Sequence, residues 1–211
     1  MKKLVVLALL VSVAFIACKT EKKETKPEVA EAKTEVAVIE DGVYTAKVEA
    51  STLNWKGYKP TGSHDGTVAI KEGNLTVKEG KLIAGTFTFD MSAITVLDIP
   101  ADDEMNAKLV KHLKNEDFFD VENNPTSTFE ITSVEGETVK GNLTVKGISK
   151  PIEFKAVVNE VEGGIELVGE TFKIDRTEYN IEYKSKKFFD NLKDKFINDE
   201  FEISFKVEAS K

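Results

Sequence analysis

The sequence predicts a mainly β fold, an antiparallel sheet that closes or stacks to hide its edges, with one or two short helices. Apolar and polar residues alternate with a period of two in many short runs, as in strands that have one buried face. Turns containing glycine or proline separate most of these runs, and a single stretch near residues 100–114 has helical periodicity instead. Closed up-and-down sheets of about eight strands enclose just enough space for side chains or one small ligand.

The first 17 residues have the layout of a secretory signal peptide. Lys2 and Lys3 precede an apolar run that is too short to span a bilayer, and a buried core helix is not typical of such a charged N-terminal stretch. Residues 15–18 (Phe-Ile-Ala-Cys) resemble a bacterial lipobox, which implies a lipidated Cys18 as the first mature residue. Several acyl chains on Cys18 would anchor the protein stably to a membrane. A plain secreted protein cleaved nearby is the alternative.

Residues 18–40 follow as a predicted disordered tether. They are rich in Lys, Glu, Ala, Thr and Val and contain Pro27, but they lack aromatic residues and a sustained apolar face. Such a segment cannot repay the entropy of ordering, so we expect a coil that reaches roughly 25 Å, or weak helix. The folded domain is therefore expected at residues 41–211, which is long enough to bury a sizeable core without cross-links.

Residues 43–91 contain several alternating runs separated by glycine-rich stretches. The stretch 55–58 (Trp-Lys-Gly-Tyr) and the glycine-rich stretch 61–66 are expected to supply turns. Phe87 and Phe89 share one face of the last strand in this half. The strands expected here are residues 43–55 (one long strand, or two with a bend), 67–70, 73–78 and 81–91.

A helix is expected to begin near Pro100. The acidic residues 102–104 suit a first turn because carboxylates complement the helix dipole. Met105, Leu109 and Leu113 recur at i, i+4 and i+8 and form an apolar stripe. The helix should end before the Asp-Phe-Phe-Asp sequence at residues 117–120.

The clearest hairpin spans residues 141–158. Leu143 and Val145 alternate with polar residues, Gly147 and Pro151 indicate a turn of four or five residues, and a second alternating run follows. The hexapeptide GNLTVK that opens the hairpin also occurs at residues 73–78, which we interpret as a recurring strand-and-turn pattern and not as a duplicated domain. The other strands expected in this half are residues 127–134, 165–181 and 201–209, with one or two helical turns within 186–194.

Composition argues against several classes of function. A net charge of −8 argues against nucleic-acid binding and against charge-driven adhesion to anionic lipid. Because Cys18 is the only cysteine, no intramolecular disulfide or cysteine-rich metal site can form. His64 and His112 have no carboxylate cluster of recognisable spacing, so no metal or other cofactor is predicted. The sequence contains no G-x-S-x-G elbow and no phosphate-cradling loop, so no catalytic residues are predicted and we expect no enzyme.

Several motifs together resemble the YceI-like family, over roughly residues 41–209. The resemblance implies a lipocalin-like antiparallel β-barrel, often dimeric, whose apolar interior accepts a polyisoprenoid tail and which is exported to the periplasm. The lipobox and the charged tether depart from the family pattern and look like a lipid-anchored branch, which leaves the identity of the ligand open. The motifs are Trp55-x-Gly57, GSHDG at 62–66, KLVKHLKNEDFFDV at 108–121, Pro125 with Thr128-Phe129, GNLTVKGI at 141–148, IDR at 174–176 and FFDNL at 188–192.

Arg176 and His64 are the candidate head-group ligands. Arg176 is the only arginine in the chain and shares a strand face with Phe172 and Ile174 if that strand stays regular. A guanidinium at a cavity mouth can hold a diphosphate bidentately. Alternatively, Arg176 pairs with a neighbouring carboxylate or a loop carbonyl and fixes the end of the strand. His64 lies in a glycine-rich loop and either assists the head group or satisfies a turn.

A large set of aromatic residues is expected either to form an ordinary core or to line a ligand cavity, since ligand pockets are mainly apolar. Phe118 and its neighbour Phe119 cannot both point inward from an extended segment, and Phe118 is the one assigned to the cavity. The apolar lining is assigned to Trp55, Tyr58, Phe87, Phe89, Phe118, Phe129, Phe154 and Phe172.

The sequence therefore favours non-catalytic binding or carriage of an apolar lipid, of the polyisoprenoid or isoprenoid-quinone type, in a barrel cavity at the cell envelope. The expected partners are this lipid, a membrane reached through Cys18, and in some cases a second copy of the chain. The alternative is a surface-anchored structural or stress-response interaction module whose barrel is filled by its own side chains.

Overall fold

The computed structural model describes residues 39–211. The expected signal peptide (1–17), the lipidated Cys18 and nearly all of the expected tether lie outside the described residues. Within residues 39–211, no helix is both long enough and apolar enough to cross a membrane.

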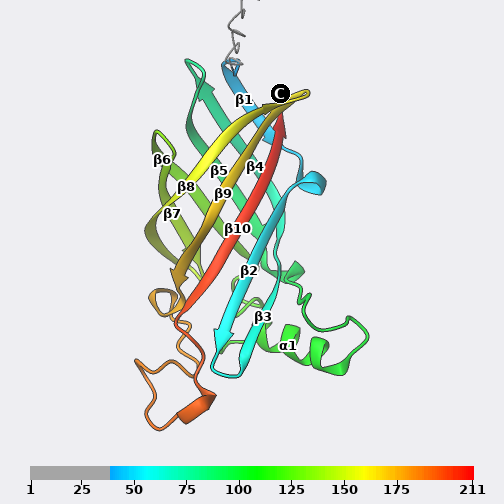
Figure 1. The fold of residues 1–211 in the computed structure, drawn as a ribbon, viewed down its shortest axis with the longest axis vertical. Helices are drawn as coiled ribbons and strands as arrows, with labels where there is room; N and C mark the ends of the chain where they lie inside the picture. The colour runs from blue at the N-terminus through cyan, green and yellow to red at the C-terminus, as the bar shows by residue number, and fades with distance from the viewer. Residues whose placement is uncertain (1–38) are drawn as a thin grey trace, which may run out of the picture. The chain divides into compact units, whose positions relative to one another are not determined.

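The fold is a closed antiparallel β-barrel with one α-helix at one end (Figure 1). Ten strand segments form eight barrel strands, because β1 and β2 are one strand interrupted by a 3-10 turn (Val48–Ala50), and β3 and β4 are one strand interrupted at Val68. Pairing of β1 with β10 closes the barrel. The segments are β1 (Gly42–Ala46), β2 (Thr52–Lys59), β3 (Gly62–Thr67), β4 (Ala69–Lys78), β5 (Lys81–Asp90), β6 (Thr126–Glu135), β7 (Thr138–Val145), β8 (Ile148–Val161), β9 (Gly164–Asp175) and β10 (Glu200–Ser210).

The predicted fold class is confirmed, but several segments were assigned wrongly. Residues 55–58 were expected to form a turn and lie inside strand β2, and the strand expected at 165–181 ends at Asp175, where a 3-10 turn (Arg176–Tyr179) follows. Residues 61–66 were expected to form turns, and they form most of strand β3, which pairs with β2. Gly66 is required there because the chain after β5 crosses it: a Cβ on Gly66 would collide with the carbonyl oxygen of Thr95. The two strands expected at 67–70 and 73–78 are one strand, β4, with a register shift after Ile70.

The central hairpin is confirmed, with a shorter turn than expected. Lys146 and Gly147 alone connect β7 to β8, and both have left-handed backbone angles (φ 50° and 74°) as in two-residue hairpin turns. Pro151 therefore lies inside β8, opposite Asn142. β9 pairs with β8 only from Ala156 onward, so Pro151 lies where β8 has a free edge, and there its missing N–H costs least.

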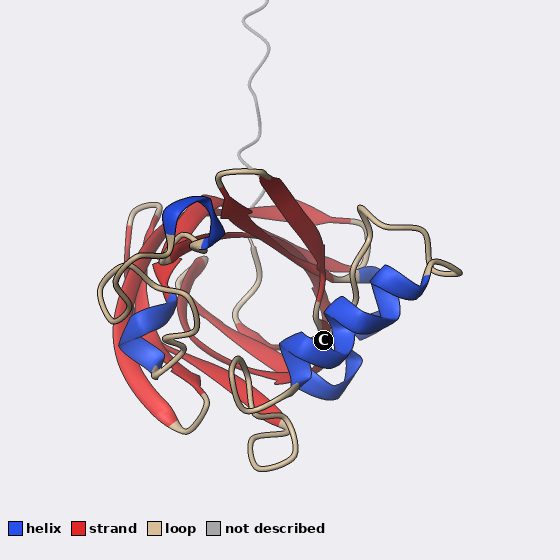
Figure 2. Ribbon diagram, turned by 90° about the horizontal axis from the view of Figure 1, so that it is seen from below, coloured by secondary structure: helices blue, strands red, loops and turns tan. Residues whose placement is uncertain are grey.

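The predicted helix is α1 (Glu104–Lys114), which begins four residues after Pro100. Asp103 caps it by accepting a hydrogen bond from the Met105 backbone N–H at 2.8 Å. The predicted apolar stripe is buried only toward its C-terminal end: Leu113 is 7 % exposed, whereas Met105 is 56 % exposed. The helix lies beside one end of the barrel (Figure 2), and its C-terminal half packs against the core through Leu109, Val110 and Leu113. In the expected helical stretch 186–194, the structure has only turns and the start of a 3-10 turn (Lys193–Lys195).

The first glycine of each GNLTVK copy packs against a phenylalanine ring. Gly73 in β4 lies under the ring of Phe87, and Gly141 in β7 lies under the ring of Phe129, so a Cβ at either glycine would collide with that ring. Phe87 and Phe129 face each other across β5 and β6. The repeated glycines thus allow two aromatic rings to lie flat against neighbouring strands inside the barrel.

Candidate functional site

The barrel encloses an apolar cavity of about 170 Å³. Side chains from most of the barrel strands line it, and the segments after β5 and β9 contribute to the lining at the end of the barrel where α1 lies (Figure 2). This end is called the mouth below. Leu113, Phe118 and Phe119 contribute from the helix side, and Ile181 and Ile197 from the other side. Few polar side chains reach the lining, among them Arg176 and Asn198 near the mouth.

Seven of the eight aromatic residues assigned to the lining from sequence do line this cavity; Tyr58 does not. Its hydroxyl donates a hydrogen bond to Glu202 Oε2 at 2.6 Å, and this bond raises the pKa of Tyr58. Phe119 also reaches the cavity along with Phe118, because this segment is a series of turns and not an extended strand. The seven are Trp55, Phe87, Phe89, Phe118, Phe129, Phe154 and Phe172.

Strand β10 supplies two lining rings that the sequence assignment omitted, Phe201 and Phe205. The signal was present, because these residues alternate with polar residues along the last strand. Gly169 on β9 lies opposite Phe205, and a Cβ there would collide with the Phe205 ring. This is a third glycine that makes room for a ring.

Phe154 is the centre of an aromatic cluster inside the barrel. Its ring stacks on Phe172 (centroids 4.6 Å apart, planes at 13°) and contacts Phe129 and Phe205, each at 5.4 Å. Such ring pairs add about 0.5–1.5 kcal/mol each beyond the burial of their area. The cluster narrows the barrel interior without filling it, so a cavity remains.

The barrel wall has a seam between β8 and β9 near the mouth. β9 carries one extra residue opposite β10 between Gly169 and Phe172, a β-bulge that turns its remaining length away from β8. Across the seam, the two strands are joined by the Phe154–Phe172 stack and, beyond the end of β9, by an ion pair between Lys150 and Glu178 at 3.1 Å. Backbone pairing of the two strands begins only at Ala156.

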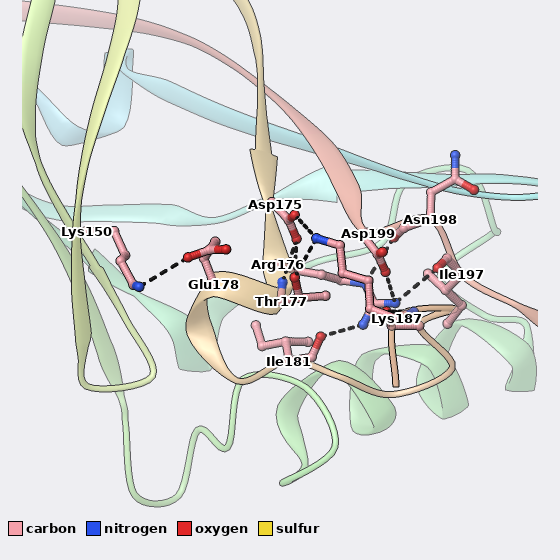
Figure 3. A network of polar contacts seen from close by, with 11 residues as sticks. Lys150, Asp175, Arg176, Thr177, Glu178, Ile181, Lys187, Ile197, Asn198 and Asp199 are labelled. Atoms are coloured by element: carbon pink, nitrogen blue, oxygen red, sulfur yellow. Dashed lines mark hydrogen bonds and ion pairs between the residues drawn. The ribbon is translucent and has the colours of Figure 1, made fainter. Parts of the chain in front are cut away.

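Arg176 is buried at the mouth, 4 % exposed, and its guanidinium is bonded to loop carbonyls (Figure 3). Nε, Nη1 and Nη2 donate to the carbonyl oxygens of Asn198 (3.0 Å), Ile181 (2.6 Å) and Ile197 (3.1 Å), respectively. These contacts correspond to the alternative in which Arg176 fixes the end of the strand. Phe172, Ile174 and Arg176 all line the cavity, as the alternation indicated, although β9 ends at Asp175.

Charges around Arg176 partly compensate its burial. Burial lowers the pKa of Arg176, and Asp199 and Asp175 oppose that shift. Asp199 Oδ1 lies 3.5 Å from Nη2, close enough for charge attraction but outside hydrogen-bond geometry. Burial would also raise the pKa of Asp175, but bonds from Lys187 and Thr177 hold that pKa below its ordinary value.

His64 does not reach the cavity lining. It lies on β3 with Nδ1 2.8 Å from Asp98 Oδ2, and Nε2 is 3.1 Å from Lys59 Nζ. Asp98 also accepts a hydrogen bond from the Asp65 N–H, so the pair fastens the segment after β5 to the edge of β3. His112 packs edge-on against Phe118 and Tyr183. Among residues 39–211, no group of His, Cys, Asp and Glu has the geometry of a metal site.

Comparison with protein families gives one match that covers most of the chain: the YceI-like domain, over residues 44–209. Among curated proteins, a UPF0312 protein of Pseudomonas aeruginosa is 40 % identical over 82 residues, and Protein YceI of Salmonella arizonae is 38 % identical over 82 residues. Each alignment covers 34 % of this chain and 43 % of the relative, so less than half of either relative's length is matched.

Two solved structures share the fold at low sequence identity. A polyisoprenoid binding domain from Saccharophagus degradans, implicated in plant cell wall breakdown, superposes with a TM-score of 0.61 at 14 % identity, covering 79 % of this chain and 97 % of that domain. BcnA of Burkholderia cenocepacia superposes with a TM-score of 0.60 at 17 % identity, covering 78 % of this chain and 99 % of BcnA.

Proposed function

Because the chain belongs to the YceI-like family, we propose that it binds and carries an apolar lipid of the polyisoprenoid or isoprenoid-quinone type without chemical turnover. The observation that carries this proposal is the enclosed apolar cavity with a few polar groups near its mouth. This combination is typical of binding sites for apolar ligands, where apolar walls supply affinity and a few polar groups fix the orientation of the ligand. The similar fold of the polyisoprenoid binding domain from Saccharophagus degradans supports the same class of ligand.

The size of the cavity limits how the lipid is held. At about 170 Å³ it is smaller than the roughly 300–1,000 Å³ of ordinary ligand pockets. We therefore propose that the cavity holds a segment of the tail, and that a longer tail enters when rings of the Phe154 cluster change rotamer. The seam between β8 and β9 is the place where such movement breaks no strand pairing.

We propose that Arg176 acts mainly by holding the mouth in shape, since its three guanidinium nitrogens already donate to loop carbonyls. A diphosphate or other anionic head would have to share the guanidinium with those carbonyls. His64, bonded to Asp98 outside the cavity, would reach a head group only beyond the barrel wall.

The proposed location is the cell envelope. Its support is the signal-like leader, the lipobox-like residues before Cys18 and the charged segment that follows. In this proposal Cys18 attaches the barrel to a membrane, and two barrels pair as the family resemblance suggests.

The small cavity favours a second candidate function, an envelope interaction module whose barrel is stabilised by its own aromatic residues. The Phe154 cluster packs four aromatic rings against one another inside the barrel, as such a module would require. Binding experiments separate the two candidates.

The test is titration of lipid-stripped full chain with a fluorescent long-chain polyprenol. Leu143→Trp adds bulk inside the cavity, and Val157→Trp adds the same bulk on the outer face of β8, where Val157 is 41 % exposed. We expect affinity to fall about tenfold or more for Leu143→Trp, at a stability cost of about 1–3 kcal/mol, and to stay unchanged for Val157→Trp. Absence of binding by the parent chain would favour the interaction module. Equal affinity in all three chains would show that the probe binds outside the cavity.

A further inference from the structure

The segment 184–197, called the mouth loop here, combines exposed aromatic rings with basic charge. It lies between the 3-10 turn after β9 (Arg176–Tyr179) and β10, and it projects beyond the strand ends at the mouth (Figure 1, orange). Phe188 and Phe189 are adjacent and are 49 % and 47 % exposed. Two adjacent exposed phenylalanines form an apolar patch on the surface, which makes the loop a candidate contact site.

The local turn holds both rings outward. The backbone N–H groups of Phe188 and Phe189 donate to the carbonyl oxygen of Ser185 at 3.2 and 3.0 Å. Ser185 itself is fully buried, and its hydroxyl accepts a hydrogen bond from the Lys187 backbone N–H at 3.1 Å. The exposure of the two rings therefore follows from a fixed turn.

The charge of the mouth loop is opposite to that of the whole protein. The loop contains five lysines and two aspartates, which give it a net charge of +3, whereas the chain as a whole carries −8. The flanking Glu182, Asp199 and Glu200 are acidic, so the positive charge is confined to residues 184–197. Lys187 is paired with Asp175, and Lys186 lies 3.5 Å above the ring of Phe196. Lys193 and Lys195 make no ion pair with any residue of the described domain, so their charges are available to a partner.

The end of the mouth loop reaches the cavity. Ile197, its last residue, lines the cavity, and the Ile197 carbonyl is one of the three that Arg176 holds. Whatever surface the exposed rings contact is therefore brought next to the opening through which a ligand would pass.

We propose that the mouth loop docks the barrel onto an anionic membrane surface, with Phe188 and Phe189 in the interfacial layer and the lysines against acidic head groups. Aromatic rings favour the membrane interface, and basic side chains near an anionic surface each add attraction. This inference rests on the proposed function, because docking would place the mouth against the lipid that the cavity takes. Charge complementarity and contact with the mouth favour a bilayer over a protein partner or a second copy of the chain.

The test places a tryptophan reporter at each end of the barrel in the full chain. Phe189→Trp reports on the mouth loop, and Val43→Trp is the matched control, since Val43 is 58 % exposed on β1 at the opposite end (Figure 1). The parent chain, with Trp55 alone, gives the background. Each chain is mixed with vesicles of phosphatidylcholine and phosphatidylglycerol in equal parts, whose acyl chains carry bromine as a quencher, and with the same vesicles lacking phosphatidylglycerol.

Docking predicts strong quenching of the Phe189→Trp chain by the anionic vesicles, weak quenching without phosphatidylglycerol or in high salt, and background quenching of the Val43→Trp chain. Adding Lys193→Glu and Lys195→Glu to the Phe189→Trp chain should lower the docked-to-undocked ratio about tenfold or more. Quenching at neither position, or equally at both, would overturn the proposal. The Phe189→Trp reporter could instead become protected from solvent without vesicles, to a degree that rises with protein concentration. That result would show that the loop contacts a second copy of the chain, and it would also overturn the proposal. Polyprenol binding is measured separately in the parent chain, so docking and cargo binding can fail independently.

Discussion

Phe154→Ala removes the ring at the centre of the aromatic cluster. The ring is 7 % exposed and contacts Phe172, Phe129 and Phe205. If the cluster lines a cavity that a lipid tail enters, its removal should both destabilise the empty barrel and enlarge the space for the tail.

The cost of Phe154→Ala can be worked from burial. A phenylalanine side chain buries about 150–200 Å² of apolar area, which at about 25 cal/mol per Å² corresponds to roughly 4–5 kcal/mol. Measured Phe→Ala changes in cores cost about 3–5 kcal/mol, in agreement. The deleted ring adds about 100 Å³ to the cavity, and at about 24 cal/mol per Å³ this void accounts for roughly 2.4 kcal/mol of the loss. A ligand that fills the void should recover a part of this size.

The assay is urea unfolding of lipid-stripped parent and variant, each with and without a polyprenol. We expect Phe154→Ala to lose about 3–5 kcal/mol when empty. Saturating polyprenol should stabilise both chains by mass action, and should stabilise the variant by about 2 kcal/mol more than the parent. Val157→Ala, on the outer face of the same strand, is the control and should change stability by less than about 0.5 kcal/mol.

Two results would refute this reasoning. A loss of less than about 1 kcal/mol on Phe154→Ala would mean that the ring is not packed as the cluster geometry indicates. A normal loss with no additional stabilisation by polyprenol in the variant would mean that the enlarged cavity is not where the lipid binds.

Three further predictions concern the wall and the mouth. Arg176→Lys keeps the charge but loses the guanidinium nitrogens that reach three carbonyls, so it should lower the free energy of unfolding in urea by about 3 kcal/mol. It should weaken the binding of prenyl diphosphate and of prenyl alcohol by the same factor. A loss of affinity for the diphosphate alone would instead indicate that Arg176 binds the head group. Gly169→Ala should lower the free energy of unfolding by about 1–3 kcal/mol because the new Cβ displaces the Phe205 ring. Gly57→Ala is the control, because no atom lies near its added Cβ and no steric cost is expected. Equal losses of stability would show that the Phe205 ring is not packed against Gly169. The pKa of Asp175 is lowered by folding, so this carboxylate stabilises the fold above its unfolded pKa of 3.8, and that stability is lost as the pH falls through the folded pKa. The difference in stability between the parent and Asp175→Asn should therefore shrink below pH 3.8. A difference that does not depend on pH would contradict this prediction.

The period-two alternation was sufficient to predict the strands that have one apolar face. The hairpin at residues 141–158 and the last strand, β10, follow from it directly, because inward residues such as Phe154 and Val207 alternate with charged ones. A glycine-rich strand cannot be recognised in this way. Gly62 and Gly66 suggested turns, whereas Gly66 is small because the chain at Thr95 passes over it, a contact between segments about 30 residues apart.

The sequence indicated the types of residue at the candidate site better than their individual contacts. Most of the aromatic residues assigned to the lining lie around the cavity, whereas Tyr58 lies outside it, because its hydroxyl pairs with Glu202 across the neighbouring strand β10. The partners of Arg176 were not predictable, because two of its three carbonyl acceptors lie about 20 residues away on the mouth loop and beside it. The β9 bulge, which creates the seam, has no local sequence signal that we recognise.

The most direct measurement is native mass spectrometry of the full chain purified from its own membrane, followed by solvent extraction and analysis of any released lipid. The account predicts one apolar isoprenoid-type molecule per barrel in the parent chain, and a much lower occupancy in Leu143→Trp, whose added ring fills the cavity. A parent chain that is folded, carries no bound lipid and takes up none from added polyprenol would contradict it.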